Sequence, residues 1–354
     1  MGNFNPTPQP PIVYAARMNF PHRTAILCSL LLAGSVAYAT DPPLSLESIG
    51  DAFGISEGDV EALRKGKRVG GDLSLAADNE LALSVGLRTT ATPADLWTYQ
   101  VKGRTFEVDP TIAQYGLIGD NAASSLATLT LPDVEIERLA KAEPGSDINL
   151  STVEIESLQK IAASTTEPGA RRDALLNGFR RILQGRVEAY RKGGLDAVVP
   201  YDRGKDKGGA PAVELEHALG ELRATQKLAP RVYEAIANYP HSSLEGVKSD
   251  LYWIVHAAED EVLVTLSHRV YAQQNDHTMF IDHRYYVNHT ANSMQVVMVA
   301  VPAETGSIVF YANRTYTDLV AGMLGKIARG IGRTIMRSEI KGTVDAFQES
   351  ADSP

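Results

Sequence analysis

The decapeptide IDHRYYVNHT at residues 281–290 concentrates side chains that can do chemistry. It contains two histidines, two tyrosines, an arginine and an aspartate. A histidine with a carboxylate partner can act as a general base, and neighbouring histidines can bind a metal ion. A β-strand with one polar face can have the same composition, so the interpretation depends on the element that carries these residues.

The spacing of the histidines does not favour metal binding. His277, His283 and His289 are six residues apart, so they would share one face of an unbroken strand. Such a strand would be 13 residues long, well beyond the usual length of about 5–6 residues. The spacing also differs from the compact zinc-binding patterns. We therefore predict neither a metal site nor a cofactor.

Alternation along a strand divides this decapeptide between two faces. One face carries His283, Tyr285 and His289, and the other carries Arg284, Tyr286 and Asn288. We expect the histidine face to look into a ligand cavity. The sequence has no G-x-S-x-G motif and no phosphate-binding glycine-rich loop after a strand, so we assign no catalytic residue. An enzyme that uses His268 or His289 as a general base is the alternative.

Residues 1–39 have the layout of a secretory signal peptide. They contain no Asp or Glu, and their apolar stretch, Ala25–Ala37, ends at the small-x-small site Ala37-Tyr38-Ala39. This stretch is too short to span a hydrocarbon layer about 30 Å thick. The Pro-rich residues 1–17 are interpreted as an over-extended start. We expect a soluble protein exported to the periplasm.

Composition limits the possible partners. The net charge of the chain is −9, and it becomes −11 without residues 1–39, which hold two arginines and no acidic residue. A negative balance argues against nucleic acid as a partner, because phosphate binding requires an excess of Lys and Arg. Apolar residues make up 44% of the chain, which is typical of a globular protein with a hydrophobic core.

Strands are predicted in both halves of the chain, with helices between and after them. Residues 80–89 alternate as a strand, and Thr92 and Pro93 then begin a helix. Residues 141–245 read as a helical insertion that contains a capping box from Ser151 to Glu154. The parts before and after it, residues 40–140 and 246–354, would form one domain. Its five later strands are expected at residues 251–255, 261–270, 279–288, 294–301 and 307–313.

Several motifs resemble those of a group of exported bacterial proteins within the START-like, or helix-grip, superfamily. The matching stretches are PGSDINLS at 144–151, Tyr252-Trp253, Ser267-His268, Tyr286-x-x-His289 and Tyr311-x-Asn313-Arg314-x-x-x-Asp318. The first motif of that group usually carries cysteines, whereas this chain has Ser146. The resemblance implies an α+β fold in which a curved antiparallel sheet wraps a long C-terminal helix, here with a helical insertion.

That fold implies an apolar cavity between sheet and helix, and hence a lipid or another hydrophobic small molecule as ligand. Transfer of the lipid at a membrane would follow. A structural periplasmic protein that docks a partner through residues 141–245 is a further alternative. The expected ligand-binding residues are His268, His283, Tyr285, His289, Arg314, Met323 and Ile327.

The closing helix, expected from about Asp318 to Gln348, carries an apolar stripe. Beside it Arg329, Arg333, Arg337 and Lys341 recur every four residues. Such a basic stripe suits transient contact with an anionic membrane, although a solvated outer face is the simpler interpretation. Glycines inside a helix cost about 1 kcal/mol each relative to alanine. Those at positions 322, 325, 330, 332 and 342 therefore predict a close approach to the sheet or a bend.

Overall fold

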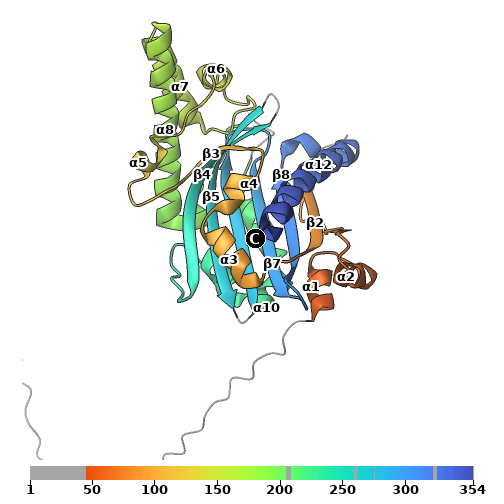
Figure 1. The fold of residues 1–354 in the computed structure, drawn as a ribbon. Helices are drawn as coiled ribbons and strands as arrows, with labels where there is room; N and C mark the ends of the chain where they lie inside the picture. The colour runs from red at the N-terminus through yellow and green to blue at the C-terminus, as the bar shows by residue number, and fades with distance from the viewer. Residues whose placement is uncertain (1–44, 205–208, 259–260, 275, 322–324, 354) are drawn as a thin grey trace, which may run out of the picture. The chain divides into compact units, whose positions relative to one another are not determined.

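The structure, a computed structural model, describes residues 45–204, 209–258, 261–274, 276–321 and 325–353 (Figure 1). The predicted signal peptide, residues 1–39, lies outside this part of the chain. Among the described residues, no helix has both the length and the apolar character needed to cross a membrane.

A single sheet of eight antiparallel strands, in the order β1-β2-β8-β7-β6-β5-β4-β3, organises the chain. The early strand β2 pairs with the last strand β8 along its whole length, which joins the two halves of the sequence. The five strands predicted after residue 246 are confirmed. The strands are β1 (Val69–Gly71), β2 (Glu80–Thr89), β3 (Ile112–Leu117), β4 (Val247–Ala258), β5 (Glu261–Gln274), β6 (His277–Val287), β7 (Ser293–Pro302) and β8 (Ser307–Tyr316).

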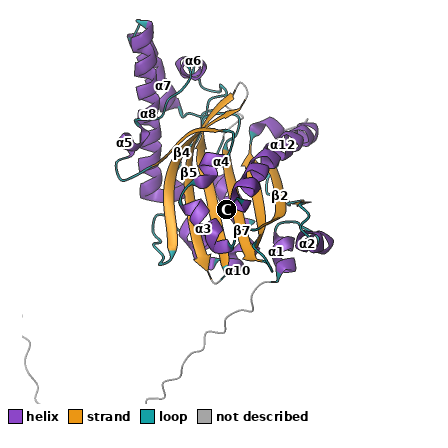
Figure 2. Ribbon diagram, viewed as in Figure 1, coloured by secondary structure: helices purple, strands orange, loops and turns teal. Residues whose placement is uncertain are grey.

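One face of the sheet is covered by the long C-terminal helix α12 (Gly325–Asp352), together with α3 (Pro93–Val101) and α4 (Arg104–Val108) (Figure 2). Thr92 caps α3 in a capping box with Asp95, as the sequence predicted. The closing helix starts later than expected. Residues Asp318–Val320 form a separate 3₁₀ turn, which Thr317 caps by accepting a hydrogen bond from the backbone N–H of Leu319.

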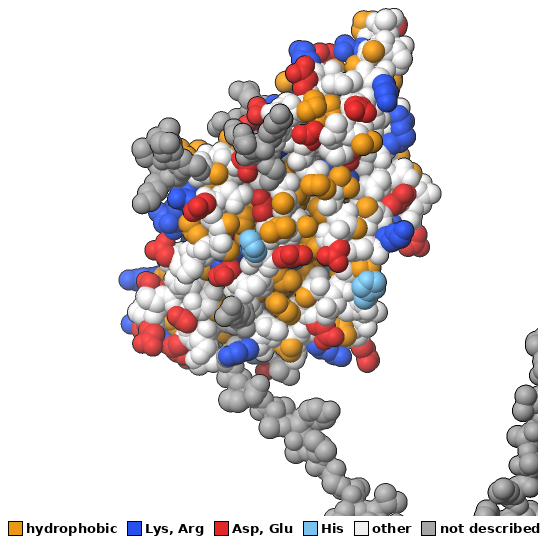
Figure 3. Space-filling model, turned by 180° about the vertical axis from the view of Figure 1, so that it is seen from behind, with side chains coloured by type: hydrophobic (Ala, Val, Ile, Leu, Met, Phe, Trp, Pro, Cys, Tyr) orange, Lys and Arg blue, Asp and Glu red, His pale blue; other side chains and the backbone are white. Residues whose placement is uncertain are grey.

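Helices from the first two-thirds of the chain cover the opposite face. The capping box of Ser151 and Glu154 is present at the start of α7. The helical layer begins before residue 141, because α5 and α6 already pack against α8. Its members are α1 (Leu46–Ala52), α2 (Glu57–Arg64), α5 (Ala122–Leu126), α6 (Asp133–Ala140), α7 (Thr152–Ser164), α8 (Pro168–Gly193), a 3₁₀ turn (Gly194–Ala197), α9 (Pro211–Gly220), α10 (Arg223–Leu228) and α11 (Pro230–Ala237). Seen from behind, apolar side chains form a band between charges of both signs (Figure 3).

Because both faces of the sheet are covered, each strand contributes to two cores. On β6, Phe280 packs in the core under α12, whereas Met279 and Ile281 pack in a core under the opposite helices. The described chain is therefore α+β, with one curved antiparallel sheet and a long C-terminal helix, as predicted.

Candidate functional site

The space between α12 and the sheet contains a cavity of about 490 Å³. Clefts that bind small molecules commonly have volumes of about 300–1,000 Å³. The helix contributes the apolar side chains of Ala328, Ile331, Ile335, Met336 and Ile340, together with the polar Glu339 and Thr343. The sheet and its turns contribute both apolar and hydroxyl groups: Leu81, Leu263, Thr265, Thr290, Ala291, Met294, Tyr311, Thr315 and Thr317.

A smaller cavity of about 90 Å³ lies beside the first. Both cavities are lined by Asp109, Arg284, Tyr311 and Thr343. The smaller cavity continues between apolar side chains of the core, among them Leu87, Val296 and Phe347. The two cavities therefore meet at a polar wall, with aliphatic surface on either side.

A chain of hydrogen bonds builds that polar wall. Nη1 of Arg284 lies 3.2 Å from Nε2 of His256, whose Nδ1 lies 3.1 Å from Oγ1 of Thr111. Thr111 donates to Oδ1 of Asp109 at 2.7 Å. Because an arginine can only donate, Nε2 of His256 is the acceptor and its proton is on Nδ1. Burial, followed by the charges of Arg284 and Arg269, holds the pKa of His256 well below its usual value, so the ring is neutral.

Behind Arg284 lies a buried ion pair. Asp282 accepts a hydrogen bond from Nε of Arg269 at 3.2 Å and another from the Ser267 hydroxyl. The Arg269 guanidinium also lies 3.9 Å above the ring of Phe106, a cation–π contact. Arg284 is farther from the carboxylate, at 3.6 Å between Nε and Oδ2 of Asp282. Asp282 is therefore compensated mainly by Arg269, and Arg284 is the less fully paired cation.

Two buried polar atoms that line the larger cavity have no hydrogen-bond partner within the described chain. They are Oγ1 of Thr265, a residue 1% exposed, and Nε of Arg284. Buried polar atoms are usually satisfied, so each is a position where a ligand can supply the missing partner.

The mouth of the cavity combines apolar and acidic side chains. Leu319, Ile331 and Ile335 are all more than half exposed. The carboxylates of Glu261 and Glu339 line the same cavity. Burial raises the pKa of Glu339, and the negative charges of Glu261 and Asp109 raise it further.

The expected histidine face does not look into this cavity, so that prediction is wrong. His268 contacts Tyr190 of α8 through Nδ1 (2.8 Å) and Ser249 through Nε2 (2.8 Å), on the opposite face of the sheet. His283 pairs with His268 across the strands and binds Gln295 at 2.8 Å. The ring of Tyr285 stacks on Tyr190 at 4.0 Å.

A β-bulge explains a second difference on this strand. The register between β5 and β6 shifts by one residue, because Leu266 pairs with Tyr286 whereas Ser267 pairs with Arg284. Tyr285 and Tyr286 consequently both enter the core under α8, instead of pointing to opposite faces. Bulges insert one extra residue and reset the alternation.

His289 and Arg314 were also expected in the cavity, and neither lines it. His289 follows the end of β6, and its Nε2 lies 2.9 Å from the backbone oxygen of Val262. Its Nδ1 lies 2.8 Å from the hydroxyl oxygen of Thr290, a cavity-lining residue. Arg314 points to the opposite face, where it binds Glu80 at 2.6 Å rather than Asp318. His289 therefore lies behind Thr290 and does not line the cavity.

Met323 lies outside the described residues, as does the side chain of Ile327. The four basic residues of α12 lie on the other flank of the helix from the mouth. Arg329 donates to the backbone oxygen of Asp78, and Arg333 binds the carboxylate of Asp72 at 2.7 Å.

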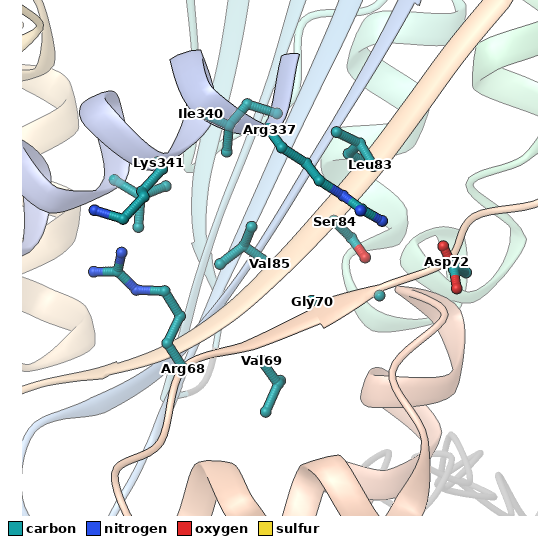
Figure 4. A pocket seen from close by; sticks show the side chains of 12 residues that line it. Arg68, Val69, Gly70, Asp72, Leu83, Ser84, Val85, Arg337, Ile340 and Lys341 are labelled. Atoms are coloured by element: carbon teal, nitrogen blue, oxygen red, sulfur yellow. The ribbon is translucent and has the colours of Figure 1, made fainter. Parts of the chain in front are cut away.

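Arg337 and Lys341 line a separate groove of about 330 Å³ between α12, β1 and β2 (Figure 4). Its floor is apolar, formed by Val85 and Ile340 among others, and Arg68 borders it opposite Lys341. Asp345 binds both Arg68 and Lys341. The groove is thus basic at its rim, but two of its cations share one carboxylate.

Sequence reasoning did not find His256, Arg284, Thr265 or Tyr311 as lining residues. Arg284 and Thr265 have the parity opposite to that of the histidine face. A correct choice between the two faces would have identified them. In the described residues, no group of three or more His, Cys, Asp or Glu side chains is arranged to hold a metal ion.

Comparison with models of protein families, with curated proteins and with solved structures gives no match to this chain. The candidate site therefore has to be interpreted from its own geometry.

Proposed function

We propose that the protein is a helix-grip, START-like binding protein that holds a lipid or another hydrophobic small molecule between α12 and the sheet. The observation that carries the proposal is the cavity of about 490 Å³, whose lining is mostly apolar, with polar side chains gathered at the wall and at the mouth. Apolar pockets with a few convergent polar groups are the usual form of small-molecule sites.

Binding is favoured over catalysis by the state of His256, a histidine that lines the cavity. Both of its ring nitrogens are engaged within the protein, one with Arg284 and the other with Thr111. A general base must have a free lone pair within reach of the substrate proton. His268, the other proposed base, is buried on the opposite face against Tyr190.

Export to the periplasm and delivery of the ligand at an anionic membrane are further parts of the proposal. Export rests on the sequence of residues 1–39 alone. Membrane contact is supported by the exposed Ile331 and Ile335 beside the cavity mouth. The basic stripe supports it less directly, because Arg333 and Lys341 are paired with acidic residues.

Binding of the neutral fluorescent probe N-phenyl-1-naphthylamine tests the proposal. We expect saturable binding that the substitution Ala328→Phe weakens by about tenfold, or about 1.4 kcal/mol, because the new ring projects from α12 into the cavity. Val153→Phe, at an exposed position of α7, is the matched control and should leave binding unchanged. Equal binding by both variants, or no binding by the natural chain, would contradict the proposal.

Native mass spectrometry of protein purified without detergent supplies a second test. We expect a non-covalent adduct with the mass of a small hydrophobic molecule, and a lower occupancy for Ala328→Phe than for Val153→Phe. An adduct of equal occupancy in the two variants would place the ligand elsewhere.

A further inference from the structure

The polar wall and the charged mouth of the cavity together restrict the kind of ligand that fits. We infer that the cavity selects an uncharged apolar molecule with a hydroxyl or carbonyl oxygen, and discriminates against the corresponding carboxylate. This inference rests on the proposed function, because it specifies the ligand of the same cavity.

Hydrogen-bond donors and acceptors for such an oxygen line the larger cavity. The hydroxyl of Thr265 has no partner within the described chain, and it can both donate and accept. In the same residues the guanidinium of Arg284 forms hydrogen bonds only through Nη1, to His256 and to the sulfur of Met294. A hydroxyl or carbonyl oxygen placed at this wall would satisfy groups that are otherwise left unpaired.

The charges around the cavity oppose an additional anion. Asp109, Glu261 and Glu339 line it with acidic groups, while Arg284 is the one Lys or Arg among the described lining residues. The second cation nearby, Arg269, is already paired with Asp282. A bound carboxylate would add a negative charge to a site that already has an excess of them. Water screens the repulsion from the exposed Glu261 and Glu339, and it screens that from the half-buried Asp109 less.

The carboxylates lie at both ends of the cavity, where the polar end of a ligand would be placed. Glu339 and Thr343 lie one turn apart on α12, and Thr343 donates to Asp109 at 3.3 Å. The acidic groups therefore extend from the exposed mouth to the polar wall. A chain carrying a carboxylate would meet them at either end, whereas an alcohol or an ester would meet only hydrogen-bonding partners.

The experiment compares ligands that share one chain length and differ in the end group. Dodecanol, methyl dodecanoate, dodecane and dodecanoic acid each compete with N-phenyl-1-naphthylamine at about pH 8, where the acid is ionised. We expect the alcohol and the ester to displace the probe at concentrations about tenfold lower than the carboxylate. A carboxylate that competes as well as the alcohol would overturn the inference.

The variant Glu261→Gln/Glu339→Gln tests the cause. Both side chains are exposed, so the substitutions should leave the fold intact. We expect binding of dodecanoate to strengthen several-fold, while binding of dodecanol stays the same. Glu57→Gln, at an exposed position of α2 on the opposite face, is the control and should change neither. If the double variant still prefers dodecanol to dodecanoate by the same factor, the electrostatic explanation is overturned.

The outcomes also separate this inference from the proposed function. If none of the four compounds displaces the probe and the probe itself does not bind, the proposed cavity function fails. If the compounds bind in an order that does not depend on the charge of the end group, the cavity function holds and the inference on ligand class fails.

Discussion

Asp282 shows how a single buried carboxylate shapes the candidate site. It has no solvent exposure, and it is held by Arg269 and Ser267 beneath the polar wall. Removing one partner of a buried ion pair is costly because the remaining charge is left in a poorly solvated place. The pair therefore fixes the position of the strands that carry Arg284 and Thr265, the two residues with unsatisfied groups.

We expect Arg269→Met to lower the free energy of unfolding by about 3–5 kcal/mol, as breaking buried pairs generally does. Urea unfolding followed by circular dichroism measures this loss. The double variant Arg269→Met/Asp282→Leu removes the carboxylate that the single variant leaves unpaired, so we expect part of the stability to return. The loss of the contact between Arg284 and Asp282 should keep the double variant less stable than the natural chain. A single variant as stable as the natural chain would show that water or Arg284 already compensates Asp282.

At the same scale, the sequence predicted which residues of β6 share a face only as far as the bulge at Tyr285, and it did not predict which face lines the cavity. Normally the polar face of a strand marks solvent and the apolar face marks the core. Here both faces are buried, Met279 and Ile281 on one side and Phe280 on the other. His268 and His283 form hydrogen bonds with Tyr190, Ser249 and Gln295 from distant parts of the chain, so no local pattern distinguishes the two faces.

At the scale of elements, the long strands and the capped helices were predictable because their signals are local. The five C-terminal strands are rich in β-branched and aromatic residues, and the capping boxes of α3 and α7 lie within four residues. Edge strand β3 was not predictable. Its Gly116 weakens the strand pattern, yet a Cβ there would lie 2.5 Å from Nε1 of Trp253 on β4. Only the tertiary contact explains that residue.

Three glycines of α12 have described surroundings, and one of them shows the close approach to the sheet that was expected as an alternative to a bend. A Cβ at Gly332 would lie 3.0 Å from Leu81 on β2, whereas Cβ atoms at Gly330 and Gly342 would have open space. We expect Gly330→Ala and Gly342→Ala each to stabilise the protein by about 0.5–1 kcal/mol, and Gly332→Ala to give less or to destabilise.

Thermal unfolding of the three single variants measures the difference, with the natural chain as reference. If Gly332→Ala stabilises the protein as much as Gly330→Ala does, Leu81 moves aside without an energetic cost. Destabilisation at Gly330 or Gly342 would mean that those positions are covered by something that the described residues do not include.

At the scale of the whole molecule, the helical layer and the sheet are joined through buried histidines. His268 contacts Tyr190 of α8, and His283 contacts Gln295 on β7 beneath α9, whose Ala218 accepts from the same glutamine. Burial lowers the pKa of His268 from 6.5 to about 3 and that of His283 from 6.5 to about 4. Both rings are therefore neutral in the folded protein at neutral pH.

These lowered pKa values predict a loss of stability in acid. Below pH 6.5 the unfolded chain gains protons at both histidines while the folded protein does not. The free energy of unfolding is therefore unaffected by protonation of these two histidines above pH 6.5. It declines as the pH falls toward their folded-state pKa values, by about 1.4 kcal/mol per pH unit for each histidine. Because carboxylates also titrate in this range, the test compares slopes between variants.

Urea unfolding between about pH 4.5 and 6.5 should show a shallower pH dependence for His268→Asn and for His283→Asn than for the natural chain, by about 1 kcal/mol per pH unit each. His217→Asn, at an exposed position of α9, should leave the slope unchanged. Equal slopes in all four proteins would mean that the buried rings take up protons as readily in the fold as in the unfolded chain. His268 and His283 would then not contribute to acid sensitivity, and their role would be limited to packing between the sheet and the helical layer.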